Sequence, residues 1–180
     1  MAKLHPAANM RNVVPTGHES YFGRDELIVS KTDLHGKITY ANRIFLRVAG
    51  FDEAELIGQP HSIIRHPDMP RSVFGLMWQT LHAKREIFAY VVNLARNGDH
   101  YWVLAHVTPS YVDGEVVGYH SSRRKPEASA ISASEALYAE LRDVERRASS
   151  RVEAVSAGIA HLEARLAERG QTYEEFVFSL

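Results

Sequence analysis

The chain has 180 residues and a formal net charge of −1, so its overall charge gives no general attraction to nucleic acid or to an anionic membrane surface. It contains no cysteine, which excludes disulfides, thiolate metal sites and cysteine nucleophiles. Neither a secretory signal nor a membrane-spanning apolar run is evident, and we expect a cytoplasmic protein of one domain plus an appendage, without membrane insertion.

The N-terminal part of the sequence predicts an arm followed by a β-hairpin. Residues 1–24 are mixed in character and contain scattered proline and glycine, so we expect them to form an arm. Segments 26–33 and 37–42 are rich in β-branched residues and flank a short turn that contains glycine. This pattern is typical of two antiparallel strands joined by a tight turn.

The next part of the sequence predicts several short helices. Asn42 can cap an apolar helix that ends at Gly50, and a second short helix is expected over 52–58. Residues 61–69 form an irregular stretch. Pro70 suits the first turn of a longer helix, in which apolar residues recur at spacings of three and four.

Three further strands are expected at 86–93, 100–109 and 115–124, and the tight turns between them predict an antiparallel meander. The order of two strands, several helices and three strands indicates an α+β fold. We therefore expect a five-stranded antiparallel sheet with short helices on one face, and assign residues 25–126 to this domain.

Residues 127–180 predict a helical segment after the sheet. Apolar residues from Leu137 to Leu166 recur mostly at alternating spacings of four and three, as in a heptad seam with a stutter between Ala148 and Val152. The sequence at the stutter is also compatible with a break between two helices. A coiled-coil-like seam predicts a homodimer, whereas the alternative is an amphipathic helix that packs back on its own domain.

The stretch Arg65-His66-Pro67-Asp68 is a candidate site. Arg65 presents a planar set of hydrogen-bond donors, Asp68 can orient Arg65 or His66, and Pro67 and Pro70 stiffen the loop. These features predict a ligand clamp, while the alternatives are helix capping with a surface ion pair, and catalysis. Because no arranged nucleophile, phosphate-binding glycine loop or metal motif accompanies the stretch, we expect neither an enzyme nor a metal site.

Four segments of the sequence together resemble the PAS domain of the bacterial aerotaxis receptor family: GQPHSIIRHPDMP, MWQTL, NGDHYWV and VGYHSSRR. The resemblance covers about residues 25–125 and implies the PAS fold, a sensory role and noncovalently bound FAD that reports redox state. It places Arg65, His66 and Asp68 where the family has flavin-supporting residues, and it matches Trp78 with a tryptophan of the family motif.

A more distant similarity to the flavin-binding PAS domains called LOV domains implies further site residues. It places Asn93 where an asparagine hydrogen-bonds the flavin ring edge, His120 where these domains carry a glutamine, and His61 where they carry the photoreactive cysteine. The absence of cysteine excludes the LOV photoadduct. The similarity also turns Val103 and Ala105 toward the ligand. Taken alone, Asn93 also suits a strand end before a turn, and His120 suits a hydrogen-bonded strand histidine.

Alternation along the same strand predicts which side chains face away from the ligand. Because successive side chains of a strand point to opposite faces, Val107 shares the inner face, and Trp102, Leu104 and His106 lie on the outer face. An apolar stripe of this kind requires cover. The N-terminal arm, the C-terminal helix or a second subunit could supply it.

The combined expectation is a sensory PAS protein that binds FAD and relays redox or ligand state through protein–protein contact. Too few residues remain for an enzymatic or DNA-binding output module, so a sensor kinase or a chemotaxis signalling protein is the expected partner. One alternative is a ligand-free adaptor that acts by dimerisation or kinase contact. Another is a haem-based gas sensor, with His82 as a candidate axial ligand. The charged residues 121–125 lack interleaved aromatic residues and predict a solvated strand end rather than a nucleic-acid contact.

Overall fold

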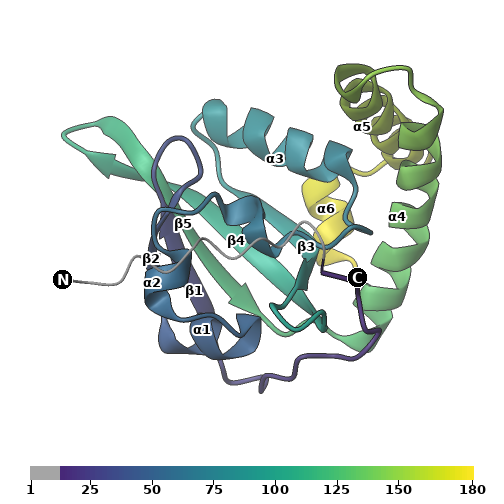
Figure 1. Cartoon of the computed structure of the whole chain (residues 1–180). Helices are drawn as coiled ribbons and strands as arrows, with labels where there is room; N and C mark the ends of the chain where they lie inside the picture. The colour runs from purple at the N-terminus through teal and green to yellow at the C-terminus, as the bar shows by residue number, and fades with distance from the viewer. Residues whose placement is uncertain (1–12) are drawn as a thin grey trace.

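The computed structural model describes residues 13–180 (Figure 1), so the first half of the expected arm lies outside the described residues. The observed order of strands and helices confirms the predicted α+β fold class. The elements are β1 (Ile28–Thr32), β2 (Ile38–Ala41), α1 (Arg43–Ala49), α2 (Glu53–Leu56), the 3-10 helix η2 (His61–Ile64), α3 (Arg71–His82), β3 (Ile87–Leu94), β4 (His100–Val112), β5 (Glu115–Arg124), α4 (Ala128–Arg147), α5 (Arg151–Glu168) and α6 (Tyr173–Phe178).

All five strands form one antiparallel sheet in the order β2-β1-β5-β4-β3. The last three strands make the predicted meander, and the short helices connect the edge strand β2 to the opposite edge strand β3. Figure 1 shows α3 lying across one face of the sheet, with α4 beside the β3 edge. No helix among residues 13–180 is long and apolar enough to cross a membrane.

Side-chain caps stabilise the N-termini of helices α1 and α3. Asn42 caps α1 as predicted, because its side chain accepts a hydrogen bond from the Phe45 N–H at 3.0 Å. Helix α3 begins after Pro70, which provides no side-chain cap. Glu145 of α4 takes this role, and its carboxylate accepts hydrogen bonds from the N–H groups of Arg71 at 3.0 Å and Ser72 at 2.8 Å.

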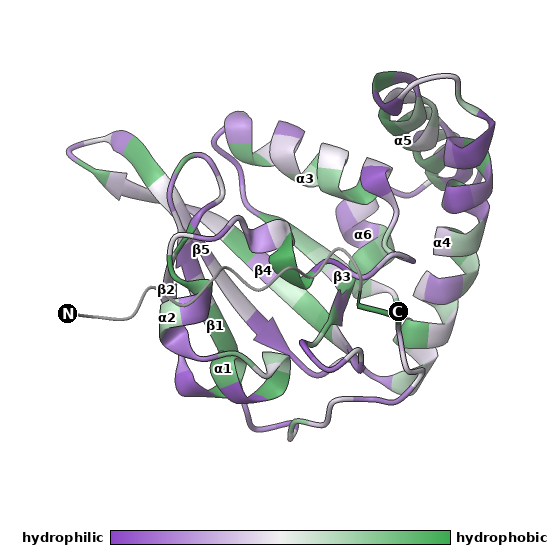
Figure 2. Cartoon of the chain, in the orientation of Figure 1, coloured by the Kyte–Doolittle hydropathy of each residue, from purple (hydrophilic) through white to green (hydrophobic). Residues whose placement is uncertain are grey.

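The C-terminal segment forms separate helices rather than one continuous heptad helix. Helix α4 ends at Arg147, and Ser150 caps α5 by accepting a hydrogen bond from the Glu153 N–H at 3.1 Å. The predicted break therefore occurs at the stutter, where Val152 is 81% exposed. Figure 2 shows polar and apolar residues alternating along α4 and α5. Their apolar faces pack within this chain, as the alternative of amphipathic helices packed back on their own domain predicts.

Helices α4 and α6 of the same chain cover the outer face of the sheet at β3 and β4. The ring of Trp102 stacks on Tyr138 of α4 with centroids 6.0 Å apart. Phe88 of β3 stacks on His106 and also meets Phe178 of α6 edge-on, at a centroid distance of 4.7 Å. The predicted orientation of the Trp102 stripe is confirmed, and its cover is supplied within the chain.

Candidate functional site

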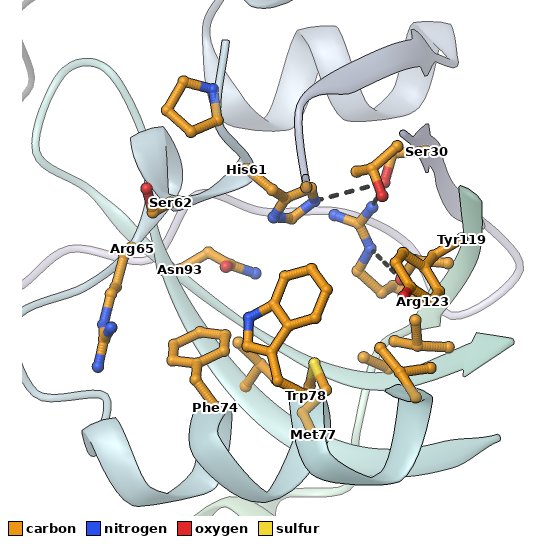
Figure 3. Close-up of a pocket in the computed structure, with 18 of the residues that line it drawn as sticks. Ser30, His61, Ser62, Arg65, Phe74, Met77, Trp78, Asn93, Tyr119 and Arg123 are labelled. Atoms are coloured by element: carbon orange, nitrogen blue, oxygen red, sulfur yellow. Dashed lines mark hydrogen bonds between the residues drawn. The ribbon is translucent and has the colours of Figure 1, made fainter. Parts of the chain in front are cut away.

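A cavity of about 310 Å³ lies between α3 and the inner face of the sheet (Figure 3). Its volume falls at the lower end of the range of about 300–1,000 Å³ that is typical of small-molecule sites. Apolar side chains from α3 and the central strands form most of the wall, and β1, β5 and η2 add polar groups. The lining residues are Ser30, Thr32, His35, Gly36, Pro60, His61, Ser62, Arg65, Phe74, Met77, Trp78, Leu81, Val91, Asn93, Ala105, Val107, Tyr119, Ser121 and Arg123.

The α3 side of the cavity is aromatic and sulfur-containing. Phe74, Met77 and Trp78 lie on one face of α3 because residues three and four apart share a helix face, and all three line the cavity. The Trp78 indole meets Tyr119 edge-on with centroids 5.5 Å apart. It also lies directly over Gly36, where an added Cβ would come within 3.1 Å of the ring. A glycine in the β1–β2 turn therefore allows Trp78 to close the cavity.

Arg65 and Asn93 lie at the same end of the cavity, where their main chains form an isolated antiparallel bridge. The Arg65 guanidinium lies over the Phe74 ring at 4.5 Å and donates a hydrogen bond to the Met69 carbonyl at 3.2 Å. Burial lowers the pKa of Arg65 to about 10, which leaves the group charged at neutral pH.

Asn93 carries an unused hydrogen-bond donor. Its side chain is only 3% exposed, and the Nδ2 atom has no hydrogen-bond partner within residues 13–180. Buried amide groups are almost always hydrogen-bonded, so an unpaired donor that lines a cavity is suited to meet a ligand acceptor. The structure thus brings four of the predicted site residues together: Arg65, Trp78, Asn93 and Ala105.

Three other predicted site residues lie outside the cavity lining. His66 is buried beneath the loop, where its Nδ1 accepts a hydrogen bond from the Asp68 N–H at 3.1 Å, and burial lowers the pKa of this imidazole. Asp68 is exposed, and its carbonyl accepts a hydrogen bond from Arg142 of α4 at 2.6 Å. These contacts hold the loop to α4. Val103 is fully buried on the inner face of the sheet but does not line the cavity.

The position expected for His120 requires a correction of one residue along β5. Tyr119, Ser121 and Arg123 line the cavity, so alternation places His120 on the opposite face of the sheet. Burial lowers the pKa of His120, and the charge of Lys31 on the neighbouring strand β1 lowers it further. A shift of one residue exchanges the two faces of a strand, so Tyr119 and Ser121, the neighbours of His120, face the cavity instead.

The expectation of a solvated strand end at residues 121–125 is wrong for Arg123, a principal site residue that strand pairing buries in the centre of the sheet. Arg123 is 2% exposed and lies over the Phe45 ring at 4.7 Å. Its Nη2 donates to the Ser30 hydroxyl and its Nε donates to the Ser121 hydroxyl at 3.1 Å, while Nη1 has no partner among the described residues. Burial lowers the pKa of Arg123 to about 10, so the group remains a cation at neutral pH.

His61 lies beside Arg123 in the same corner of the cavity. Its Nε2 lies 3.3 Å from the Ser30 hydroxyl, and its ring stacks on Phe45 with centroids 5.9 Å apart. Burial, and then the charge of Arg123, lower the pKa of His61 to about 3, so the imidazole is neutral at pH 7. His82, the candidate axial haem ligand, lies exposed at the end of α3 and outside the cavity lining.

The sheet order, the helices across one face and the cavity between them define an α+β domain of the PAS type. Residues 38–123 match the family described as PAS fold, and this chain contains a PAS domain. The chain is 44% identical over 114 residues to the aerotaxis receptor of Escherichia coli (strain K12), a match that covers 63% of this chain and 22% of that protein. It is also 34% identical over 97 residues to the nitrogen fixation regulatory protein of Klebsiella pneumoniae, covering 53% of this chain and 20% of that protein.

Solved structures with the same fold include light-oxygen-voltage domains. One, studied with a flavin analogue, matches with a TM-score of 0.53 and 18% identity, and covers 59% of this chain and 81% of that one. The light-state structure of the Aureochrome1 LOV domain matches with a TM-score of 0.52 and 18% identity, and covers 68% of this chain and 94% of that one. These similarities support the fold, and the chain spans about a fifth of the length of the two curated relatives described above.

Proposed function

We propose that this chain is a sensory PAS module that binds a flavin, FAD, in the cavity and relays its redox state to another protein. The observation that carries the proposal is the combination of an aromatic wall with unpaired buried donors on Asn93 and Arg123. A flavin ring is planar and apolar on its faces, and its edge carries carbonyl and ring-nitrogen acceptors. The ring faces can pack against the aromatic wall, and the edge acceptors can accept hydrogen bonds from the unpaired N–H groups.

The residues of the cavity fit separate parts of this ligand. Phe74, Met77 and Trp78 would contact the ring faces, whereas Asn93 and Arg123 would donate hydrogen bonds to the ring edge. A bound flavin supplies electron-transfer chemistry that no side chain provides. The identity with a protein named aerotaxis receptor supports a sensory role, and the resemblance to that family supports FAD as the flavin.

The output of the module is a change in contact with another protein. Helix α3 lies between the cavity and the C-terminal helices, so a change at Trp78 reaches Glu145 of α4 through one rigid element. The partner is a second copy of this chain, a sensor kinase or a chemotaxis signalling protein. Gly75 of α3 packs against Val155 of α5 so tightly that an added Cβ would come within 2.5 Å of it, so movement of α3 displaces α5.

Reconstitution with FAD and FMN tests the proposal. A flavin at one hundred times its dissociation constant stabilises the protein by about 2.7 kcal/mol, which a thermal melt detects as a higher Tm. Asn93→Ala removes the unpaired donor and is expected to weaken flavin binding, whereas Ala139→Ser on the exposed side of α4 serves as a control with unchanged binding. A protein that neither flavin stabilises would act as a ligand-free adaptor instead.

A further inference from the structure

The corner of the cavity around Arg123 contains a buried positive charge without a counter-ion. Arg123 is 2% exposed, and none of the described residues that line the cavity is aspartate or glutamate. The hydrogen-bond acceptors of its guanidinium are the hydroxyls of Ser30 and Ser121, which solvate the charge but do not neutralise it. The Nη1 atom has no partner within residues 13–180 and is buried.

The groups closest to Arg123 are neutral at physiological pH. His61 is unprotonated because burial and the charge of Arg123 hold its pKa at about 3. Burial also raises the pKa of Tyr101, so its hydroxyl keeps its proton and has no hydrogen-bond partner among the described residues. The other cation of the cavity, Arg65, lies at the Asn93 end. Arg123 therefore carries a buried positive charge that no described neighbour neutralises, and a negatively charged ligand group could neutralise it.

We propose that Arg123, Ser30 and His61 form an anion-recognition subsite, which makes the cavity bind its ligand more tightly when the ligand group beside Arg123 is negatively charged. The inference rests on the flavin proposal and adds a preference for one charge state of the ligand. A neutral oxidised flavin ring that gains two electrons and one proton carries a net charge of −1. A fixed cation at the ring edge stabilises this form relative to the oxidised ring.

Burial makes this preference strong and nearly independent of salt. Mobile ions screen charges that are exposed to solvent, whereas a pair inside a cavity interacts through a medium of lower dielectric constant. The Ser30 and Ser121 hydroxyls and the Phe45 ring hold the guanidinium in place before the ligand arrives. A positioned charge of this kind needs little reorganisation when the ligand becomes an anion.

The midpoint potential of bound FAD, measured during stepwise reduction with dithionite, tests the subsite directly. Arg123→Gln is expected to lower the preference for the reduced ring at least tenfold, which equals a fall of about 30 mV for a two-electron couple. Arg124→Gln is the matched control, since Arg124 is the next residue of β5 and is exposed. An Arg123→Gln protein with the wild-type potential would overturn the proposal.

The ligand-free protein provides a second, independent test. If the role of Arg123 is to bind a ligand, its unpaired charge lowers the stability of the ligand-free protein. Arg123→Met is then expected to have a Tm equal to or higher than that of wild type. A lower Tm for Arg123→Met, with Arg124→Met unchanged, would show that Arg123 is a structural group and would overturn the proposal. If wild-type protein takes up no flavin, the proposed function is wrong, and this comparison alone decides the role of Arg123. The same comparison of melting temperatures decides the role of Arg123 if the Arg123→Gln protein does not retain FAD.

Discussion

His61 makes the stability of the fold depend on pH. Its pKa is about 3 in the folded chain and about 6.5 when the chain unfolds. Between these values the unfolded chain binds a proton that the folded chain does not, so the free energy of unfolding falls as pH falls through this window. The slope approaches about 1.4 kcal/mol per pH unit for one group.

His61→Gln is expected to remove this contribution, so that the variant loses less stability than wild type between pH 6.5 and pH 4. Urea unfolding at a series of pH values measures the difference. His18→Gln is a suitable control because His18 is exposed on the arm. Parallel pH profiles for wild type and His61→Gln would contradict the buried, neutral imidazole.

Trp102 and Ala105 lie on opposite faces of β4 and predict opposite phenotypes. Trp102→Ala removes the ring that stacks on Tyr138 and is expected to cost about 3–5 kcal/mol of stability, while flavin uptake is retained. Ala105→Trp fills the cavity wall and is expected to block flavin uptake while the C-terminal helices stay docked. Chemical denaturation and flavin titration of both variants measure the two effects. Loss of flavin binding in Trp102→Ala alone would contradict these orientations.

The resemblance to flavin-binding PAS domains placed Trp78, Asn93 and Ala105 among the candidate site residues, and all three line the cavity. The sequence pattern missed Arg123 because both faces of β5 are largely polar around Ser121, so hydrophobic alternation does not reveal which face is buried. Arg123 becomes recognisable only when strand pairing places it in the centre of the sheet, between β1 and β4.

At the scale of elements, α3 depends on a residue of α4 for its N-terminal cap. Glu145→Ala removes the carboxylate that accepts hydrogen bonds from Arg71 and Ser72, and is expected to cost about 1 kcal/mol. Hydrogen exchange of the first-turn amides of α3 is expected to accelerate at the same time. Glu135→Ala, at an exposed position of α4, is the control with unchanged exchange. Equal protection in the two variants would exclude Glu145 as the cap.

Elements with strong local signals were predicted closely. The turns and caps around Asn42 and Gly50 lie where expected, since each depends on neighbouring residues alone. The path of the C-terminal helices did not follow from local signals, because a heptad seam can pack on another chain or on its own domain. The serines before Arg151 favour a break there, and long-range packing on α3 and the sheet decides the outcome.

At the scale of the whole molecule, helices α4 and α6 shield the outer face of the sheet, while α5 packs on α3. Deletion of residues 128–180 uncovers Trp102, Leu104 and the apolar residues of β3. We expect the truncated protein to self-associate more than the full chain and to bind an apolar dye, because a large exposed apolar patch favours association. Light scattering measures the mass of both proteins. If the mass of the truncated protein falls by more than the mass of the deleted residues, the helices instead mediate dimerisation between chains.

The absorption spectrum after incubation with excess FAD and removal of free ligand by gel filtration tests the central claim most directly. We predict that wild-type protein elutes with a stoichiometric flavin band and that Ala105→Trp, which fills the cavity, elutes folded and colourless. A wild-type protein that elutes without flavin, with a Tm that neither FAD nor FMN raises, would contradict a flavin-binding cavity.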